Sequence, residues 1–442
     1  MGMMEGMLHH ADPYMPGHGD LSYDVEHASV DLDYRPSSNL LEGSATLTIV
    51  AAEAVRRIRL DLAHLRVSRV LVDGARAKHS HVTTHLTVTL PAPVDAGARL
   101  TVQVDYRGNP RPLRMRAFGE AGWEELEDGV IVAAQPHGAP TWMPCNDRAS
   151  SKATYDLSVK VPSEYAVACS GEQTGVERRG ASRTFRFAQR APMASYLATV
   201  QIGRYQEVRQ QSSVPMRVLR PTGMTGAAYE ASFGLQPQMM ACFEHEFGQY
   251  PFDDYTTVVT DDELEIPLES QSLSTFGRNF CRPEWDAVRL IAHELAHQWF
   301  GNAVTARTWR DIWLHEGFAC YSEWVWSEAA GGLTIDEQAA LHHARLTGLP
   351  QDLVLSDPGA ADMFDDRVYK RGALTLVALR RTIGADAMRT LLHAWVDEHS
   401  GGTVETADLV ALASRVSGQD VAPLLRAWLD EPALPALPPV AG

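Results

Sequence analysis

The stretch His293-Glu294-Leu295-Ala296-His297 constrains this chain more than any other. Residues four apart in a helix project from the same face, so a helix here would bring two imidazole rings close enough to share one metal ion. Apolar residues recur at helical spacing around this stretch, Pro283 precedes it and Gly301-Asn302 follows it. These signals predict a helix that begins just after Pro283 and ends near Gly301.

Glu316 follows His297 after a gap of eighteen residues and lies in a second helical pattern, from Ile312 to Tyr321. Catalytic zinc sites usually combine three protein ligands with one open position, and two histidines with one glutamate are a known set. The spacing therefore predicts a site for one Zn²⁺ ion held by His293, His297 and Glu316. The alternative is that both histidines are ordinary helix residues, and the spacing to Glu316 argues against it.

Glu294 follows His293 directly and would therefore stand beside the metal rather than bind it. Zinc lowers the pKa of a bound water from about 15.7 to about 7, which makes a hydroxide nucleophile available at neutral pH. A carboxylate at this place can take the proton from that water and later deliver it to a leaving amine. The residues together predict amide hydrolysis without a covalent intermediate, with Glu294 as the general base.

The chain resembles the aminopeptidase N family of zinc metallopeptidases, whose signature is His-Glu-x-x-His, eighteen residues and Glu. The four residues named above meet this signature. The runs 298–302 and 313–319 also match the family, with His315 where the family usually has Asn. The resemblance implies a zinc-dependent aminopeptidase with one Zn²⁺ ion per chain, which removes single residues from the N-termini of peptides.

The resemblance also implies three residues that contact the substrate. Glu269 matches the glutamate of the family's Gly-x-Met-Glu-Asn motif, which binds the free α-ammonium group. Tyr369 matches the tyrosine of a Tyr-x-x-Gly-Ala element, whose hydroxyl steadies the oxyanion. Gln135, ten residues before Cys145, matches a Glu or Gln that helps to hold the substrate amine. Without the resemblance, Glu269 is more typical of a solvated loop acid and Gln135 of a polar loop residue. For Tyr369, the alternative is a tyrosine that packs at a helix start.

Two interpretations concern the surroundings of this site. The short segment 266–270 lies upstream of the zinc helix and could pair its backbone with a peptide substrate, as an added strand pairs with a sheet edge. Glu323 follows Glu316 by seven residues and so lies on the same helix face. It would either support the zinc ligands through a hydrogen bond or be an exposed helix acid.

Strand and helix patterns divide the chain into two main domains, as expected because a single core rarely exceeds about 250 to 300 residues. Short alternating runs from residue 21 to 205 predict the half-buried strands of a β-sandwich or an open saddle. From 206 to 430, a few strands give way to helices around the zinc helix. We therefore predict an α+β multidomain protein. Its N-terminal all-β saddle or sandwich precedes a thermolysin-like, mainly α-helical zinc peptidase domain, as the resemblance also implies.

The ends of the chain have a different character. Residues 1–20 predict a flexible N-terminal segment, and residues 431–442 predict a loosely ordered tail rich in Pro and Ala. Helical patterns after Tyr369 lie around 374–382, 385–399, 406–416 and 421–428. The family's large C-terminal helical domain has no counterpart in this sequence, which predicts a short form with a more open cleft and looser control of substrate length.

Composition restricts the partners and the compartment. The formal net charge of -17 argues against nucleic acid and anionic membranes, which are bound mainly through Lys and Arg. The expected partners are peptides with a free N-terminus. Five scattered cysteines without a CxxC pair indicate reduced thiols, and no signal peptide or membrane span is visible, so we expect a cytoplasmic protein. We expect a monomer.

Two other functions stay open at this point. The first is a zinc endopeptidase or oligopeptidase, which the open cleft and the incomplete exopeptidase motif favour. The second is a catalytically silent peptide-binding protein that keeps the fold. An aminopeptidase needs the free amine of its substrate, whereas an endopeptidase also cleaves blocked peptides, and a silent protein cleaves neither.

Overall fold

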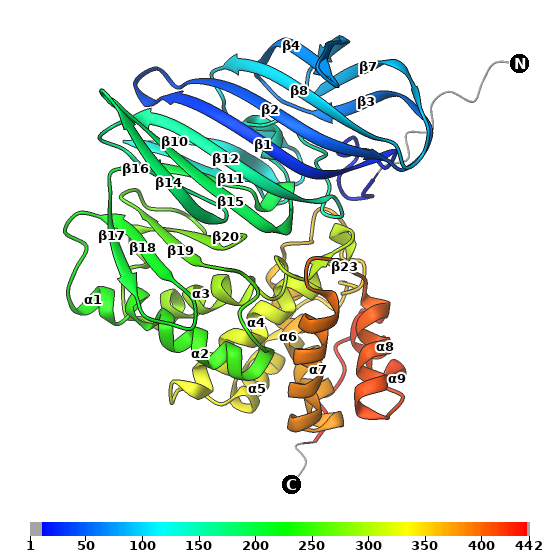
Figure 1. The fold of residues 1–442 in the computed structure, drawn as a ribbon. Coiled ribbons are helices and arrows are strands. Elements are labelled where there is room, and N and C mark those ends of the chain that lie inside the picture. Colours follow the sequence, from blue (N-terminus) through cyan, green and yellow to red (C-terminus); the bar gives the residue numbers. More distant parts are fainter. Residues whose placement is uncertain (1–10, 440–442) are drawn as a thin grey trace, which may run out of the picture. The chain divides into compact units, whose positions relative to one another are not determined.

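The computed structural model describes residues 11–439, and the chain divides into two compact units, Met1–Tyr205 and Gln206–Gly442 (Figure 1). The first unit consists mostly of strands, whereas the second contains all the α-helices of the described residues. This order of a β-rich part followed by a helical part agrees with the predicted α+β class.

Alternation of buried and exposed side chains builds the largest sheet of the first unit. The strand Tyr23–Arg35 buries Tyr23 and Val25, and a bulge between Val25 and His27 then moves the buried positions to Ala28 and Val30. The eight strands of this sheet are β1 (Tyr23–Arg35), β2 (Leu40–Ala51), β4 (Arg66–Val72), β5 (Ala75–Arg76), β8 (Arg99–Gly108), β12 (Lys152–Pro162), β14 (Glu172–Arg179) and β15 (Ser182–Ala194). Their order is β14-β15-β12-β1-β2-β8-β4-β5, and only β1 and β12 pair in parallel among the pairs described.

Two smaller sheets complete the first unit. Trp123 and Trp142 are fully buried and belong to its core. The five-stranded sheet contains β9 (Leu113–Met115), β10 (Gly119–Leu126), β11 (Gly129–Ala133), β13 (Ala166–Cys169) and β16 (Val200–Gly203), and the three-stranded sheet contains β3 (Val55–Asp61), β6 (Lys78–Val82) and β7 (His85–Val94). Short 3-10 helices lie at Pro36–Ser38, Ala139–Thr141 and Ser195–Leu197.

Residues 11–20, for which the sequence suggests a flexible segment, are packed on the first unit. Met15 is 2% exposed. The backbone N–H of Gly19 donates to Asp61 Oδ2 at 3.0 Å, and His18 Nδ1 lies 2.9 Å from Asp147 Oδ2. Two buried carboxylates therefore hold this segment, while the remainder of the predicted flexible segment, residues 1–10, lies outside the described residues.

The second unit combines a small sheet with nine α-helices in its described residues. Its five-stranded sheet has the order β17-β18-β19-β21-β20, with β17 (Tyr205–Gln210), β18 (Met216–Pro221), β19 (Tyr255–Thr260), β20 (Leu268–Ser270) and β21 (Leu273–Gly277), and a separate pair is formed by β22 (Thr305–Ala306) and β23 (Thr403–Val404). The helices are α1 (Ala227–Glu230), α2 (Gln236–Phe247), α3 (Trp285–Ala296), α4 (Trp313–Ala329), α5 (Ile335–Thr347), α6 (Asp366–Ile383), α7 (Ala385–His399), α8 (Thr406–Ser417) and α9 (Ala422–Leu429). Short 3-10 helices lie at Phe233–Leu235, Arg278–Phe280 and Trp309–Asp311.

Helices α4 and α6 approach each other closely at two glycines. A Cβ atom added to Gly317 would lie 2.8 Å from the Cα of Gly372, and one added to Gly372 would lie 2.6 Å from the Cα of Gly317. Any larger residue would push the two backbones apart. Because Gly317 follows Glu316 and Gly372 lies one turn after Tyr369, this contact brings the predicted ligand and the predicted hydroxyl donor to the same place.

Several helices differ from their expected extents. The zinc helix begins after Pro283 as predicted, whereas α4 continues to Ala329 and α6 begins at Asp366, so that Tyr369 lies in the first turns of α6. Helices α2 and α5 had no counterpart among the predicted helical stretches. The start of α5 is fixed by a capping box, in which Thr334 and Glu337 satisfy each other's backbone N–H groups.

The described part of the C-terminal tail is held in place, although its composition predicts loose order. Arg371 is 4% exposed, and its guanidinium donates to the carbonyl oxygens of Trp428 at 2.9 Å and Pro432 at 2.8 Å, and also to that of Glu431. The backbone N–H of Leu434 donates to the side chain of Gln351 at 2.8 Å. The acceptors in these bonds to the buried guanidinium of Arg371 are backbone carbonyl oxygens, and the tail supplies some of them.

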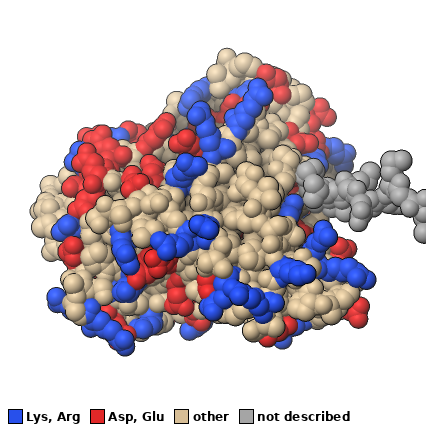
Figure 2. Space-filling view, turned by 90° about the horizontal axis from the view of Figure 1, so that it is seen from above, with Lys and Arg blue, Asp and Glu red and all other residues tan. Residues whose placement is uncertain are grey.

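The surface carries both signs of charge. On the face shown in Figure 2, Lys and Arg side chains lie in several separate places, with Asp and Glu side chains among them. Among the described residues, no helix is both long enough and apolar enough to cross a lipid bilayer.

Candidate metal centre and active site

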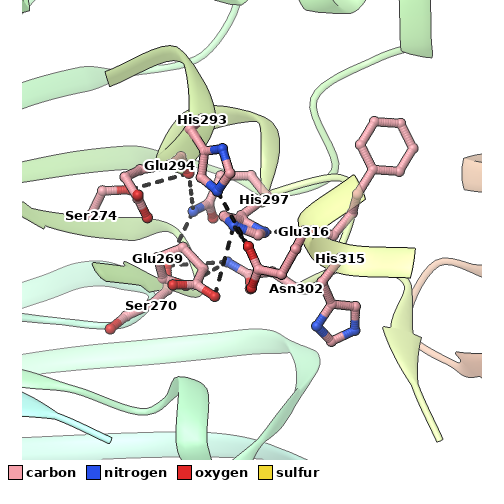
Figure 3. A network of polar contacts seen from close by, with 12 residues as sticks. Glu269, Ser270, Ser274, His293, Glu294, His297, Asn302, His315 and Glu316 are labelled. Carbon is pink, nitrogen blue, oxygen red and sulfur yellow. Dashed lines mark hydrogen bonds and ion pairs between the residues drawn. The ribbon is translucent and has the colours of Figure 1, made fainter. Parts of the chain in front are cut away.

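The three predicted zinc ligands come together in the second unit (Figure 3). His293 lies in α3, His297 lies directly after it in helical backbone conformation, and Glu316 lies in α4. The Oε2 atom of Glu316 is 3.3 Å from Nε2 of His293 and 3.4 Å from Nε2 of His297. All three side chains are buried, and one possible ligand atom of each lies within 4.8 Å of the other two.

The chemistry of this donor set fits one zinc ion. Two imidazole nitrogens and one carboxylate oxygen converge, which is a catalytic zinc set with room for a further ligand. Burial lowers the pKa of His297, but the carboxylates of Glu269 and Glu316 outweigh it and raise this pKa to about 10. The nearby carboxylates therefore favour positive charge at these ring nitrogens, as a bound divalent cation would supply.

The outer ring nitrogens of both histidines have partners that fix the rings. The Nδ1 atom of His297 lies 3.0 Å from the carbonyl oxygen of Phe300, which can only accept, so Nδ1 carries the hydrogen and Nε2 is free to bind a metal. The Nδ1 atom of His293 lies 2.8 Å from Oε1 of Glu323. Glu323 is 2% exposed, which favours the interpretation as a support of the zinc ligands over an exposed helix acid.

Two cations hold Glu323 in its ionised form. Arg289 Nη1 lies 3.3 Å from each of its oxygens, and Lys370 Nζ lies 3.7 Å from Oε2. Burial opposes ionisation of Glu323, but Lys370, the hydrogen bond to His293 and Arg289 together lower its pKa to about 2. The sequence analysis missed both cations, although Arg289 lies one helical turn before His293 and Lys370 follows Tyr369 directly.

Replacement of Glu323 by glutamine should weaken zinc binding by about 10- to 100-fold, because the amide no longer fixes the tautomer and orientation of His293 as the carboxylate does. The affinity is measured on metal-free protein by competition with a chelating dye. Glu398→Gln, which alters an exposed acid of α7, is the matched control. An unchanged zinc affinity in Glu323→Gln would contradict this role.

Glu294 lies in α3 with its side chain buried next to the ligands. It forms a second group of possible ligand atoms with Glu269 and His297, again within 4.8 Å of one another. Burial raises the pKa of Glu294 to about 8, with an added contribution from Glu269 that the two histidines partly offset. A carboxylate with a raised pKa accepts a proton readily, as a general base near neutral pH requires.

Glu269 is the middle residue of β20, which forms an edge of the five-stranded sheet. Its side chain is buried, with the residue 5% exposed, and its Oε1 atom lies 4.0 Å from Nε2 of His297. Burial raises its pKa, and Glu316 adds to the effect while His297 opposes it. The interpretation as a solvated loop acid is therefore wrong, because the carboxylate faces the ligands and not the solvent.

Tyr369 lies against the metal site. Its ring stacks on that of His293, with the ring centroids 5.9 Å apart and the planes at 22°. Burial raises the pKa of its hydroxyl well above 10, and the nearby carboxylates of Glu316, Glu269 and Glu294 raise it further. The phenol therefore keeps its proton and can act as a hydrogen-bond donor.

Gln135 belongs to the first unit, where it follows β11 closely, whereas the other six predicted site residues belong to the second unit. Its role stays a prediction. Two further polar residues escaped the sequence analysis as functional candidates: Gln298 and Asn302, which follow His297 and bond to the backbone of β20. Both lie in the run that matches the family, which was the signal available for finding them.

Comparison with protein families decides the classification. The model of the peptidase M1 N-terminal domain matches residues 21–197, and the model of the peptidase family M1 domain matches residues 231–428. This chain belongs to peptidase family M1. Membership confirms the resemblance to zinc aminopeptidases drawn from the sequence, and it agrees with the predicted order of a β-rich domain before the catalytic domain.

Solved structures of M1 zinc metallopeptidases from Deinococcus radiodurans share the fold over nearly the whole chain. The M1 zinc metallopeptidase itself is 32% identical with a TM-score of 0.88, and the match covers 98% of this chain and 99% of that chain. A mutant bound to a Tyr-Ser-Ala substrate is 31% identical with a TM-score of 0.89, with the same coverage of both chains.

Curated M1 relatives are longer than this chain. Aminopeptidase M1 of Arabidopsis thaliana is 26% identical over 330 residues, which are 67% of this chain and 36% of that protein. Leukotriene A-4 hydrolase of Xenopus laevis is 25% identical over 317 residues, which are 68% of this chain and 51% of that protein. The chain thus spans about a third to a half of the length of these relatives.

Proposed function

We propose that this protein is a zinc-dependent aminopeptidase that hydrolyses the first peptide bond of peptides with a free N-terminus. One distance carries the proposal, namely the 4.0 Å between Glu269 Oε1 and His297 Nε2. In a peptide, the α-amine and the first carbonyl carbon are only two bonds apart, about 1.46 Å and 1.52 Å long. A carboxylate that binds the ammonium group beside the metal therefore leaves room for one residue before the bond that is cleaved.

Each residue of the site has a task in this proposal. A zinc ion held by His293, His297 and Glu316 supplies Lewis acidity when bound. Glu294 takes the proton of the attacking water and passes it to the leaving amine. Tyr369 donates its hydroxyl hydrogen to the carbonyl oxygen of the scissile bond as negative charge develops there.

The substrate amine is bound by Glu269, whose carboxylate attracts the ammonium group strongly because water is excluded from its surroundings. We assign a second contact with the amine to Gln135, on the resemblance alone. The Deinococcus radiodurans relative was solved with a bound Tyr-Ser-Ala substrate, which supports peptides as the substrate class. We propose a monomeric, cytoplasmic enzyme.

Analysis of the products over time tests this function. The zinc-loaded protein is incubated with a peptide of about eight residues that begins with leucine, and samples are examined by mass spectrometry, with a chelated sample as control. Stepwise loss of single N-terminal residues, abolished by chelation, is expected. Internal fragments at early times would identify the endopeptidase alternative, and no cleavage would identify the silent peptide-binding protein.

Tyr369→Phe should lower kcat by about 100-fold with little change in KM, because the lost donor acts on charge that develops only in the transition state. Steady-state kinetics with leucine amide measures both constants, and bound zinc should stay at the wild-type level. Tyr229→Phe changes a buried tyrosine of α1 and is the matched control. A rise in KM with unchanged kcat would instead assign Tyr369 to substrate binding.

A further inference from the structure

We propose that two side-chain amides, those of Gln298 and Asn302, fix the edge strand β20 to the zinc helix and thereby restrict cleavage to the first residue of a peptide. We call Gln298 and Asn302 the amide pair. The proposal rests on the proposed function, in which Glu269 of β20 binds the substrate amine. It assigns the amide pair a positioning role: the two amides act on the backbone of β20, and Glu269 binds the substrate amine.

Asn302 holds the backbone of the amine-binding residue. It is fully buried, and its Nδ2 donates to the carbonyl oxygen of Glu269 at 3.0 Å and to that of Ser270 at 3.2 Å (Figure 3). Its own backbone N–H donates to the carbonyl oxygen of His297 at 3.0 Å. One residue therefore links the backbone of a metal ligand directly to the backbone of Glu269.

Gln298 holds the C-terminal end of the same strand and the turn that follows it. It is fully buried, its Nε2 donates to the carbonyl oxygen of Ser270 at 3.2 Å, and its Oε1 accepts from the backbone N–H of Ser272 at 2.7 Å. Ser272 has a φ of 59°, a left-handed conformation that is unfavourable for a residue other than glycine. The bond from Gln298 stabilises this turn, which joins β20 to β21.

The strand needs such support because it is short and lies at an edge. Only Leu268, Glu269 and Ser270 pair with β21, and no strand of the described residues lies on the other side. A strand of this kind opens easily unless other bonds hold it. The two amides add four hydrogen bonds, three to the carbonyl oxygens of β20 and one from Ser272 in the turn after it.

The consequence for specificity follows from distance. The amine must lie at Glu269 and the first carbonyl must lie at the metal, so the distance between them selects a single residue. A displacement of about 1 Å in such a site lowers turnover by about 100-fold. The amide pair also donates to the carbonyl oxygens of Glu269 and Ser270, so these acceptors are less available for main-chain pairing with a longer peptide that extends past the amine site.

The test compares Asn302→Ala and Gln298→Met with wild type and with Gln338→Met. Gln338 of α5 is 4% exposed and donates to Oγ of Ser327 in α4 at 3.3 Å, away from β20, so it controls for the loss of a buried amide. We measure hydrogen exchange of the amides in residues 266–274, bound zinc, and kcat/KM for a leucine-led peptide with a free and with an acetylated N-terminus.

In both variants of the amide pair, exchange in residues 266–274 should accelerate by at least about tenfold, with wild-type zinc content. The preference for the free over the acetylated peptide should fall by at least about tenfold, mainly through a higher KM for the free peptide. Gln338→Met should match wild type in both respects. Unchanged exchange in 266–274, or accelerated exchange with the wild-type preference, would overturn the proposal.

A second variant covers the case in which Asn302→Ala does not fold. Gln298→Glu keeps the acceptor for Ser272 but turns a carboxylate oxygen toward the carbonyl oxygen of Ser270, so it should shift exchange and preference in the same direction. The result for wild type distinguishes a failure of the aminopeptidase proposal from a failure of the amide-pair proposal. If wild type cleaves the acetylated peptide as well as the free one, the aminopeptidase proposal and the role of the amide pair both fail. If wild type prefers the free peptide and the two variants show the same preference, only the role of the amide pair is overturned.

Discussion

Replacement of Glu294 by glutamine is expected to lower kcat by about 100- to 10,000-fold, the usual contribution of a general acid-base group, while zinc stays bound. The amide has nearly the same size as the carboxylate but cannot take a proton from water. The three ligands His293, His297 and Glu316 are unchanged, so the metal content should equal that of wild type. Steady-state hydrolysis of leucine amide and elemental analysis of the dialysed protein measure the two quantities.

Glu284→Gln is the control for this substitution, because Glu284 is an exposed acid at the start of the same helix, with its side chain 60% exposed. It should retain wild-type kcat. A Glu294→Gln protein with normal zinc content and a kcat within threefold of wild type would exclude Glu294 as the general base. The proton would then have to be taken by another group, for which Glu269, whose carboxylate lies close to that of Glu294, is a candidate.

Replacement of His297 by alanine should remove zinc and activity together. His297 supplies one of three donors and, through its Nδ1 bond to Phe300, is held in position for the metal. The loss of zinc affinity should exceed the factor of about 10 to 100 that is typical when only an outer partner such as Glu323 is altered. Competition with a chelating dye measures it, and activity should not return at micromolar zinc.

His245→Ala provides the comparison, because the His245 side chain is 69% exposed and lies in α2, away from the ligands. It should bind zinc as wild type does. If His297→Ala kept one zinc per chain after dialysis, the metal site would have to be assigned to other residues.

The sequence predicted the local parts of this site well because their geometry depends on short spacings. The helix of His293 and His297 and the position of Glu294 follow from a four-residue period. Glu316 could be found because its spacing from His297 matches a known family signature. Figure 3 shows the outcome, with the histidine rings and the carboxylate of Glu316 facing one another.

Other parts depend on contacts between segments that are distant in the sequence, and no spacing signals them. Lys370 reaches Glu323 because Gly317 and Gly372 let α4 and α6 approach closely. The amide pair reaches β20 across about thirty residues of chain, which no local pattern reveals. Likewise, the Pro and Ala content of the tail predicted loose order because composition cannot show the buried guanidinium of Arg371 that binds its carbonyl groups.

The central claim is that a free substrate amine, bound by Glu269, selects the bond that is cleaved. The most direct measurement is kcat/KM for one leucine-led peptide with a free and with an acetylated N-terminus, using zinc-loaded protein and a chelated control. The account predicts hydrolysis of the free peptide, loss of at least about 100-fold on acetylation because the ammonium can no longer bind the buried carboxylate, and no hydrolysis after chelation. Equal rates for the two peptides would contradict the account.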